Sequence, residues 1–200
     1  MAPGTRDALI EAAADLLDRG GVEAVTLRAV GHQVGVSHNA PYKHFANKEA
    51  LLAAIAAREA TRLVTAPHGE DTPEAALRRT MHDYVTWALE HPARFRLVFG
   101  PWTTESPELA AAAHAAHTRL IGTVAAAQRS GVLPTGDPER AASLVRALAH
   151  GAADLALAGH LAADGKGHAD PHQLIDDLLD HLRTATAATR PAHGGGQEGR

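Results

Sequence analysis

The sequence predicts an all-α protein in which three short helices precede a larger bundle of six. Apolar residues recur three and four positions apart through most of the chain, which is the spacing of one face of an α-helix. The alternation of β-branched and polar residues that would indicate strands is scarce. Glycines, prolines and helix-capping residues divide the chain into segments of helical length.

The first three helices are expected over residues 5–20, 27–34 and 38–45. Residues that cap or break helices bound them, namely Thr5, Thr26 and Ser37 at the starts, and Gly20 and Gly35 after the first two. Gly35 lies where a tight turn between helices needs a positive φ. The third helix covers the sequence HNAPYKHF, and Pro41 is tolerated there because little intrahelical bonding is lost in a first turn.

Six further helices are expected over residues 48–64, 73–90, 92–99, 107–130, 138–163 and 172–187. A capping residue or a proline stands at each start: Asn47, Pro73, Pro92, Ser106, Asp137 and Pro171. The glycine-rich segment from Arg190 lacks an apolar pattern and is expected to be disordered. The expected parts are therefore residues 1–46, residues 47–189 and a tail over residues 190–200.

Composition excludes several classes of function. The chain has no cysteine, which rules out disulfides and thiolate chemistry and agrees with a cytoplasmic location. We expect neither a signal peptide nor a membrane span, because no long apolar run is present. The sequence contains no Gly-rich phosphate loop, no Gly-x-Ser-x-Gly and no His-Glu-x-x-His, so we expect no enzyme and no cofactor.

One segment is basic although the chain carries a net charge of −4. Residues 26–48 contain Arg28, Lys43, Lys48 and three histidines, and no aspartate or glutamate. Such a local island on an acidic molecule indicates a specific site for an anion. A short helix, a turn at Gly35 and a second short helix also match the helix-turn-helix pattern, whose second helix enters the major groove of DNA.

The expected second helix of this unit has one polar side. At 100° per residue, that side carries Asn39, Ala40, Lys43 and His44. Lys43 and Asn39 can reach base edges, and Ala40 can touch a thymine methyl group. Tyr42 borders this side within reach of a phosphate, and Lys48 adds charge at the start of the next helix.

The string TLRAVGHQVGVSHNAPYKHFANKEALLAAI closely resembles the DNA-binding domain of the tetracycline-repressor (TetR) family. The resemblance covers about residues 5–55, although Pro41 departs from the leucine common at its position. It implies a cytoplasmic homodimer with an N-terminal helix-turn-helix domain and a six-helix ligand-binding and dimerisation bundle. Its partners would be double-stranded operator DNA and a small-molecule effector. The implied phosphate contacts are Thr26, Arg28, Ser37, Tyr42, His44 and Lys48, and the implied base contacts are His38, Asn39, Ala40 and Lys43.

Aromatic residues gather within residues 84–102, where they predict an effector pocket. The sequence also resembles a WHG-type C-terminal domain of one TetR subgroup through Trp87, His91 and the pair His150–Gly151. The expected pocket is mainly apolar and is built from Tyr84, Trp87, Phe95, Phe99, Trp102 and Leu120, with His117 and His150 as polar anchors. A small, lipophilic, neutral or weakly polar effector fits this composition. The alternative is that the aromatic residues are core.

The last two long helices carry apolar faces that are too wide to be covered by a single neighbouring helix. These faces are formed by Leu144, Leu148 and Leu155 and by Leu174, Ile175, Leu178, Leu179 and Leu182. Two such helices from each chain would form a four-helix dimer interface.

Two other functions remain open from the sequence. The pairs His114–His117 and His168–His172 could each supply half of a zinc site, which would make the protein a zinc-responsive repressor. The protein could also be an architectural DNA-binding protein that responds to no ligand, although such a protein would not need the large second part.

Overall fold

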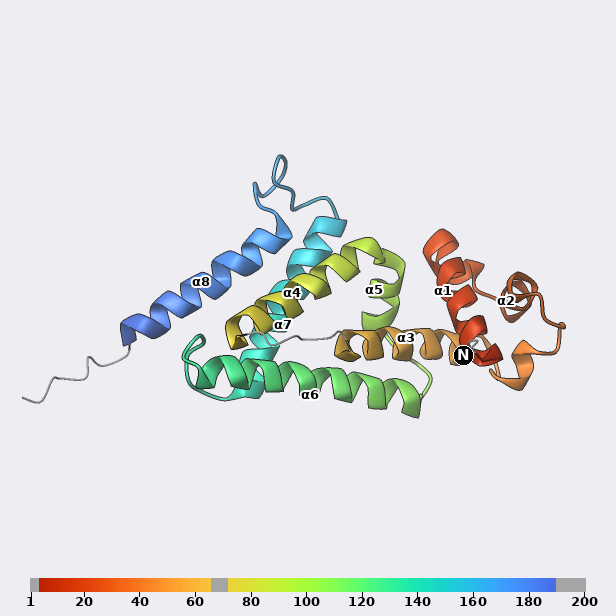
Figure 1. The fold of residues 1–200 in the computed structure, drawn as a ribbon. Helices are drawn as coiled ribbons and strands as arrows, with labels where there is room; N and C mark the ends of the chain where they lie inside the picture. The colour runs from red at the N-terminus through yellow and green to blue at the C-terminus, as the bar shows by residue number, and fades with distance from the viewer. Residues whose placement is uncertain (1–3, 66–71, 190–200) are drawn as a thin grey trace, which may run out of the picture. The chain divides into compact units, whose positions relative to one another are not determined.

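The computed structural model describes residues 4–65 and 72–189. Over these residues the chain forms eight α-helices and one 3₁₀ helix and contains no strand, which confirms the all-α class (Figure 1). The elements are α1 (Thr5–Ala24), α2 (Leu27–Val34), η1 (Pro41–Lys43), α3 (Lys48–Thr65), α4 (Pro73–Glu90), α5 (Pro92–Phe99), α6 (Pro107–Arg129), α7 (Pro138–Leu157) and α8 (Pro171–Thr189). The tail expected to be disordered lies outside the described residues.

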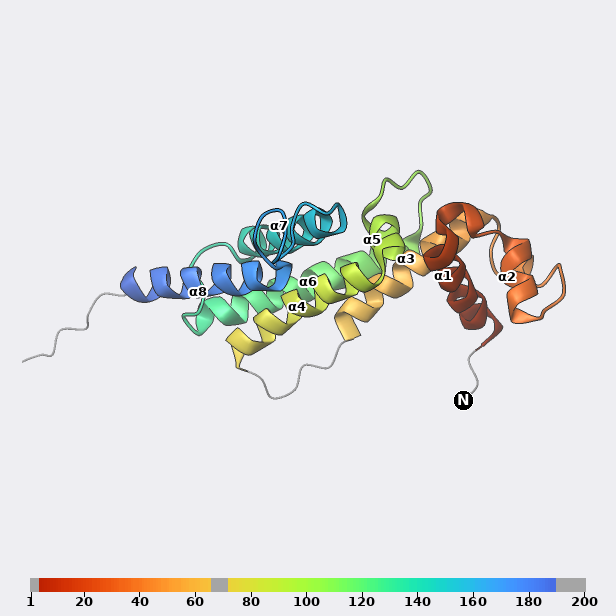
Figure 2. The ribbon, with the colours of Figure 1, turned by 90° about the horizontal axis from the view of Figure 1, so that it is seen from above.

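The helices belong to two compact units. Among the described residues, the first comprises residues 4–65 and 83–120, and the second comprises residues 72–82 and 121–189. Helices α1, α2, α3 and α5 lie in the first unit, whereas α7 packs against α8 in the second (Figure 2). The boundary expected between residues 46 and 47 stays a prediction.

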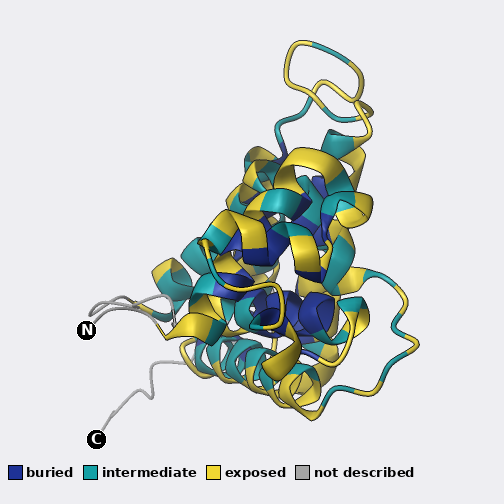
Figure 3. Ribbon diagram, turned by 90° about the vertical axis from the view of Figure 1, so that its right-hand side faces the viewer, coloured by how far each residue is buried: buried dark blue, intermediate teal, exposed yellow. Residues whose placement is uncertain are grey.

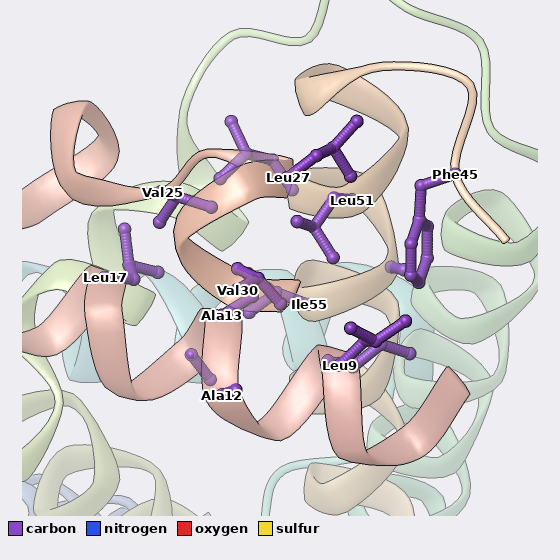
Figure 4. Packing of buried hydrophobic residues seen from close by; sticks show 14 residues of the cluster. Leu9, Ala12, Ala13, Leu17, Val25, Leu27, Val30, Phe45, Leu51 and Ile55 are labelled. Atoms are coloured by element: carbon purple, nitrogen blue, oxygen red, sulfur yellow. The ribbon is translucent and has the colours of Figure 1, made fainter. Parts of the chain in front are cut away.

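The core of the first unit follows the apolar pattern of the sequence. Leu9 and Leu17 of α1 meet Val30 of α2 and Leu51 and Ile55 of α3, and all five are almost completely buried (Figure 4). Burying one such side chain contributes about 1.5–3 kcal/mol. The buried positions lie on the inner sides of the helices, while exposed positions face outward (Figure 3).

Most of the expected helix starts carry the expected cap. Oγ1 of Thr26 accepts a hydrogen bond from the Ala29 amide at 3.1 Å, and Oδ1 of Asn47 accepts one from the Ala50 amide at 2.9 Å. Thr5 is an exception, because Gly4 occupies the N-cap position and offers no side chain. At the other end of α1, the backbone leaves helical geometry at Gly20, where the sequence predicted a stop.

The segment after Ser37 is not the regular helix that the sequence predicts. Residues 38–40 form turns, and only Pro41–Lys43 is helical, as the 3₁₀ helix η1. Amide-to-carbonyl bonds span three residues here, from Ala40 to Ser37 at 2.9 Å and from Lys43 to Ala40 at 3.2 Å. The prediction was wrong because Pro41 has no N–H and therefore cannot make the first α-helical bond to the Ser37 carbonyl.

Candidate functional site

The turn that positions the basic segment depends on two glycines. Gly35 adopts φ 75°, and its amide bonds to carbonyls at the end of α2. Gly31, on α2, faces the buried ring of Pro41, where an added Cβ would lie only 2.9 Å from Cγ of the proline. The segment after the turn can therefore approach α2 closely because position 31 has no side chain.

We expect Gly31→Ala to destabilise the fold by roughly 1–3 kcal/mol, because the added methyl group overpacks the contact with Pro41. The matched control is Gly122→Ala on α6, where an added Cβ meets nothing within 4 Å. That control should stabilise the protein by about 0.5–1 kcal/mol, since alanine replaces glycine within a helix. Urea unfolding of both variants provides the comparison, and equal stability of the two would contradict the close packing of α2 on Pro41.

Polar side chains crowd the exposed surface of the segment that follows the turn. The exposed residues are Ser37, His38, Asn39, Tyr42, Lys43 and His44. Tyr42 is 51% exposed, and its ring centroid lies 5.9 Å from that of His38. Arg28 is also exposed, and Ala40 is partly buried. Together with Arg28, these residues offer hydrogen-bond donors and two cationic side chains to an anionic partner, and we call them the basic surface.

Two of the expected phosphate contacts already have partners within the chain. The hydroxyl of Thr26 caps α2, and Nζ of Lys48 lies 3.7 Å from Oε2 of Glu23. Exposed ion pairs of this kind contribute little free energy, so Lys48 can exchange Glu23 for a phosphate at small cost.

Four of the residues expected in the effector pocket form one cluster, which we call the aromatic cluster. Its rings are those of Tyr84, Trp87, Phe95 and Phe99, with neighbouring centroids 5.5–6.3 Å apart. Phe95 is 2% exposed and Phe99 is 42% exposed, so the cluster reaches from the interior of the first unit to its surface.

The other expected pocket residues belong to other elements of the fold. Trp102 packs against the core formed by α1, α2 and α3. His117 and Leu120 are half-buried on α6 in the first unit, and His150 belongs to α7 in the second.

A buried group of charges was not predicted from the sequence. Glu59 of α3 is completely buried, and its carboxylate accepts hydrogen bonds from Nη1 of Arg94 at 3.2 Å and from Nε1 of Trp87 at 3.1 Å. Arg94 of α5 also donates from Nε to Asp18 of α1 at 2.9 Å. Arg94 thus links α5 to both α1 and α3.

The charge of Arg94 is held by its two carboxylate partners. Burial disfavours the guanidinium, but the hydrogen bond to Asp18 and the charges of Glu59 and Asp18 outweigh burial and raise the pKa of Arg94. Arg94 therefore remains charged. Glu59 also accepts a hydrogen bond from Nη1 of Arg62 at 3.2 Å, so loss of either end of the chain Trp87–Glu59–Arg94–Asp18 would remove one of several partners of a buried charge.

The helices expected to form a dimer interface expose part of their apolar faces. Leu144 and Leu155 of α7 are 67% and 47% exposed in the single chain. Four more of the expected interface residues are half-buried: Leu148, Leu174, Leu178 and Leu182. Ile175 and Leu179 are buried within the second unit, so neither side chain is available to a partner.

Across the described residues, no three histidine, aspartate or glutamate side chains are arranged to hold a metal ion. The pairs His114–His117 and His168–His172 thus gain no third ligand there. None of the helices over residues 4–65 and 72–189 is both long and apolar enough to cross a membrane.

Comparison with known proteins places this arrangement in a family. The model for bacterial regulatory proteins of the tetR family matches residues 9–55, and the model for the tetracyclin repressor-like C-terminal domain matches residues 77–182. The Escherichia coli tetracycline repressor protein class C is 43% identical over 68 residues, which are 34% of this chain and 29% of that protein. This chain thus aligns with under a third of that relative's length.

Two solved structures extend the similarity over most of the chain. A protein of unknown function from Rhodococcus sp. RHA1 is 30% identical with a TM-score of 0.78, covering 92% of this chain and 96% of that one. SmeT, the repressor of the Stenotrophomonas maltophilia multidrug efflux pump SmeDEF, is 27% identical with a TM-score of 0.57, covering 88% of each chain. Because family models match both parts of the sequence, the chain belongs to the tetR family of bacterial regulatory proteins.

Proposed function

We propose that this protein is a homodimeric transcriptional repressor that binds operator DNA through the basic surface and releases it when a small lipophilic effector binds. The observation that carries the proposal is the exposure of Asn39, Tyr42, Lys43 and His44 together on a segment without acidic residues. Carboxylates at these positions would repel phosphates, whereas donors and cations attract them.

The contacts divide between bases and phosphates. Lys43→Ala should weaken operator binding by roughly 1–3 kcal/mol and relax the preference at one base position. Lys48→Ala should weaken binding to all DNA about equally and reduce the salt slope by about one unit. Fluorescence anisotropy at several salt concentrations, with specific and random DNA, measures both effects. If the two variants lose affinity equally on both DNAs, the division of roles is wrong.

The aromatic cluster supports a lipophilic effector. Four rings in contact offer the apolar surface that binds such molecules, and the partly exposed Phe99 offers a point of entry. The name of SmeT, the repressor of a multidrug efflux pump, is consistent with this class of effector.

Phe99→Ala is expected to weaken release of the operator by the effector at least about tenfold, because a contact ring is lost. Operator affinity without effector should stay unchanged, because Phe99 lies outside the basic surface. A panel of lipophilic drugs is first tested for operator release from the unmodified protein. The compounds that act there are then measured on the variant. If the variant releases the operator as the unmodified protein does, the effector does not bind at the aromatic cluster.

The buried charges link the aromatic cluster to α1, the helix that packs against α2. Trp87 belongs to the aromatic cluster and donates to Glu59, and Arg94 carries the chain of contacts to Asp18 of α1. An effector that displaces the Trp87 indole would leave Glu59 with one fewer donor, which favours a different arrangement of α1, α3 and α5. The effector must bind that arrangement more tightly than the DNA-binding one, since otherwise no shift occurs.

A further inference from the structure

A cavity of about 410 Å³ lies in the first unit, apart from the aromatic cluster. Its walls come from the end of α1, the first turns of α3, and α5 with the loop that follows. The apolar part of its lining is formed by Leu17, Val22, Leu52, Leu97, Pro101 and Trp102. The volume lies in the range of pockets that hold small organic molecules.

The polar residues at this cavity favour an uncharged occupant. Glu49 and Arg96 both line the cavity and both are exposed. Their formal charges are opposite and sum to zero. Thr103 and Thr104 add hydroxyl groups, which donate to or accept from a neutral ligand. A strongly charged molecule would find one partner of its own sign here.

The indole N–H of Trp102 favours an occupant that carries a hydrogen-bond-accepting oxygen atom. Its Nε1 is buried and has no hydrogen-bond partner among the described residues. Such donors are rare in folded proteins, because burial removes water without supplying a replacement. A ligand with an accepting oxygen can satisfy this N–H once the indole ring turns toward the cavity.

We propose that this cavity is a second small-molecule site, which binds an uncharged, mainly apolar molecule that carries a hydrogen-bond-accepting oxygen. This inference goes beyond the proposed repressor function, which places its effector at the aromatic cluster. An occupant of the cavity contacts α1, α3 and α5 together, so its binding free energy stabilises their present arrangement.

The test is a titration of the full chain, without DNA, that follows the indole ¹H–¹⁵N resonances of the two tryptophans. Acetophenone is the probe, and ethylbenzene is its control, with nearly the same shape and no oxygen. Acetophenone should shift the Trp102 resonance with saturation below about 10 mM and leave that of Trp87 in place. Ethylbenzene should bind at least about threefold more weakly, and so should benzoate because of its charge.

A substitution that fills the cavity and the same kind of substitution at an exposed position form a matched pair of variants. Ala93→Leu places a larger side chain at the cavity wall and should abolish the shift, whereas Ala113→Leu, on the exposed side of α6, should leave it intact. If circular dichroism shows that Ala93→Leu fails to fold, Val22→Phe at the 40% exposed rim replaces it.

Three results would overturn the site: no saturable shift of Trp102 by acetophenone, equal or tighter binding of ethylbenzene or benzoate, or identical titrations of the filling and control variants. Because no DNA is present, a negative result leaves the repressor proposal to its own experiments.

Discussion

Leu144→Glu combined with Leu155→Glu should convert the protein to monomers and weaken operator binding by about 10²–10⁴-fold. The two leucines are the most exposed of the residues expected in the dimer interface, at 67% and 47%. A pair of carboxylates buried there would lack partners, which opposes association. A dimer holds two basic surfaces together so that they reach half-sites about 34–36 Å apart, and a monomer carries only one such surface.

Sedimentation equilibrium and anisotropy measure the two consequences of this change separately. The control is Ala113→Glu, which adds charge at an exposed position of α6 and should leave both assembly and affinity unchanged. If the double variant sediments as a dimer, the interface lies on other residues than Leu144 and Leu155.

Arg94→Met should lower the free energy of unfolding by up to about 3–5 kcal/mol, because it removes a buried partner of both Glu59 and Asp18 and leaves the fully buried Glu59 with Arg62 as its remaining guanidinium partner. Arg96→Met, on the same helix but exposed, should change stability by no more than about 0.5 kcal/mol. Urea unfolding with a fixed m-value compares the two variants.

A rescue variant separates the loss of a charge partner from the loss of packing. Adding Glu59→Leu to Arg94→Met should recover much of the lost stability, since the buried carboxylate that lost a partner is removed as well. If the double variant is as unstable as Arg94→Met alone, the buried ion pair is not the cause of the effect.

Features set by local chemistry were predictable from the sequence. The caps at Thr26 and Asn47 and the break at Gly20 follow from side chains and backbone freedom near each residue. The helix after Ser37 was mispredicted because polar periodicity was given more weight than the missing N–H of Pro41. That error concerns backbone geometry, and Asn39, Tyr42, Lys43 and His44 are exposed in the observed conformation.

The buried charges could not be paired from the sequence, because their partners lie far apart along the chain. Arg94 is 76 positions from Asp18 and 35 from Glu59. One signal was present, since Glu59 lies four residues after Ile55 on the apolar face of α3, where a carboxylate needs a buried partner. The separation of Trp102 from the aromatic cluster also depends on packing, which proximity in sequence does not reveal.

The most direct test of the central claim is selection of DNA by the purified protein from a pool of random duplexes, followed by sequencing. A dimer that reads DNA through the basic surface should enrich an inverted repeat whose half-sites are about one helical turn, or a multiple of it, apart. Lys43→Ala should relax one symmetric pair of positions in that repeat. Recovery of unenriched sequences, or of a motif that Lys43→Ala leaves unaltered, would contradict the claim that this surface reads an operator.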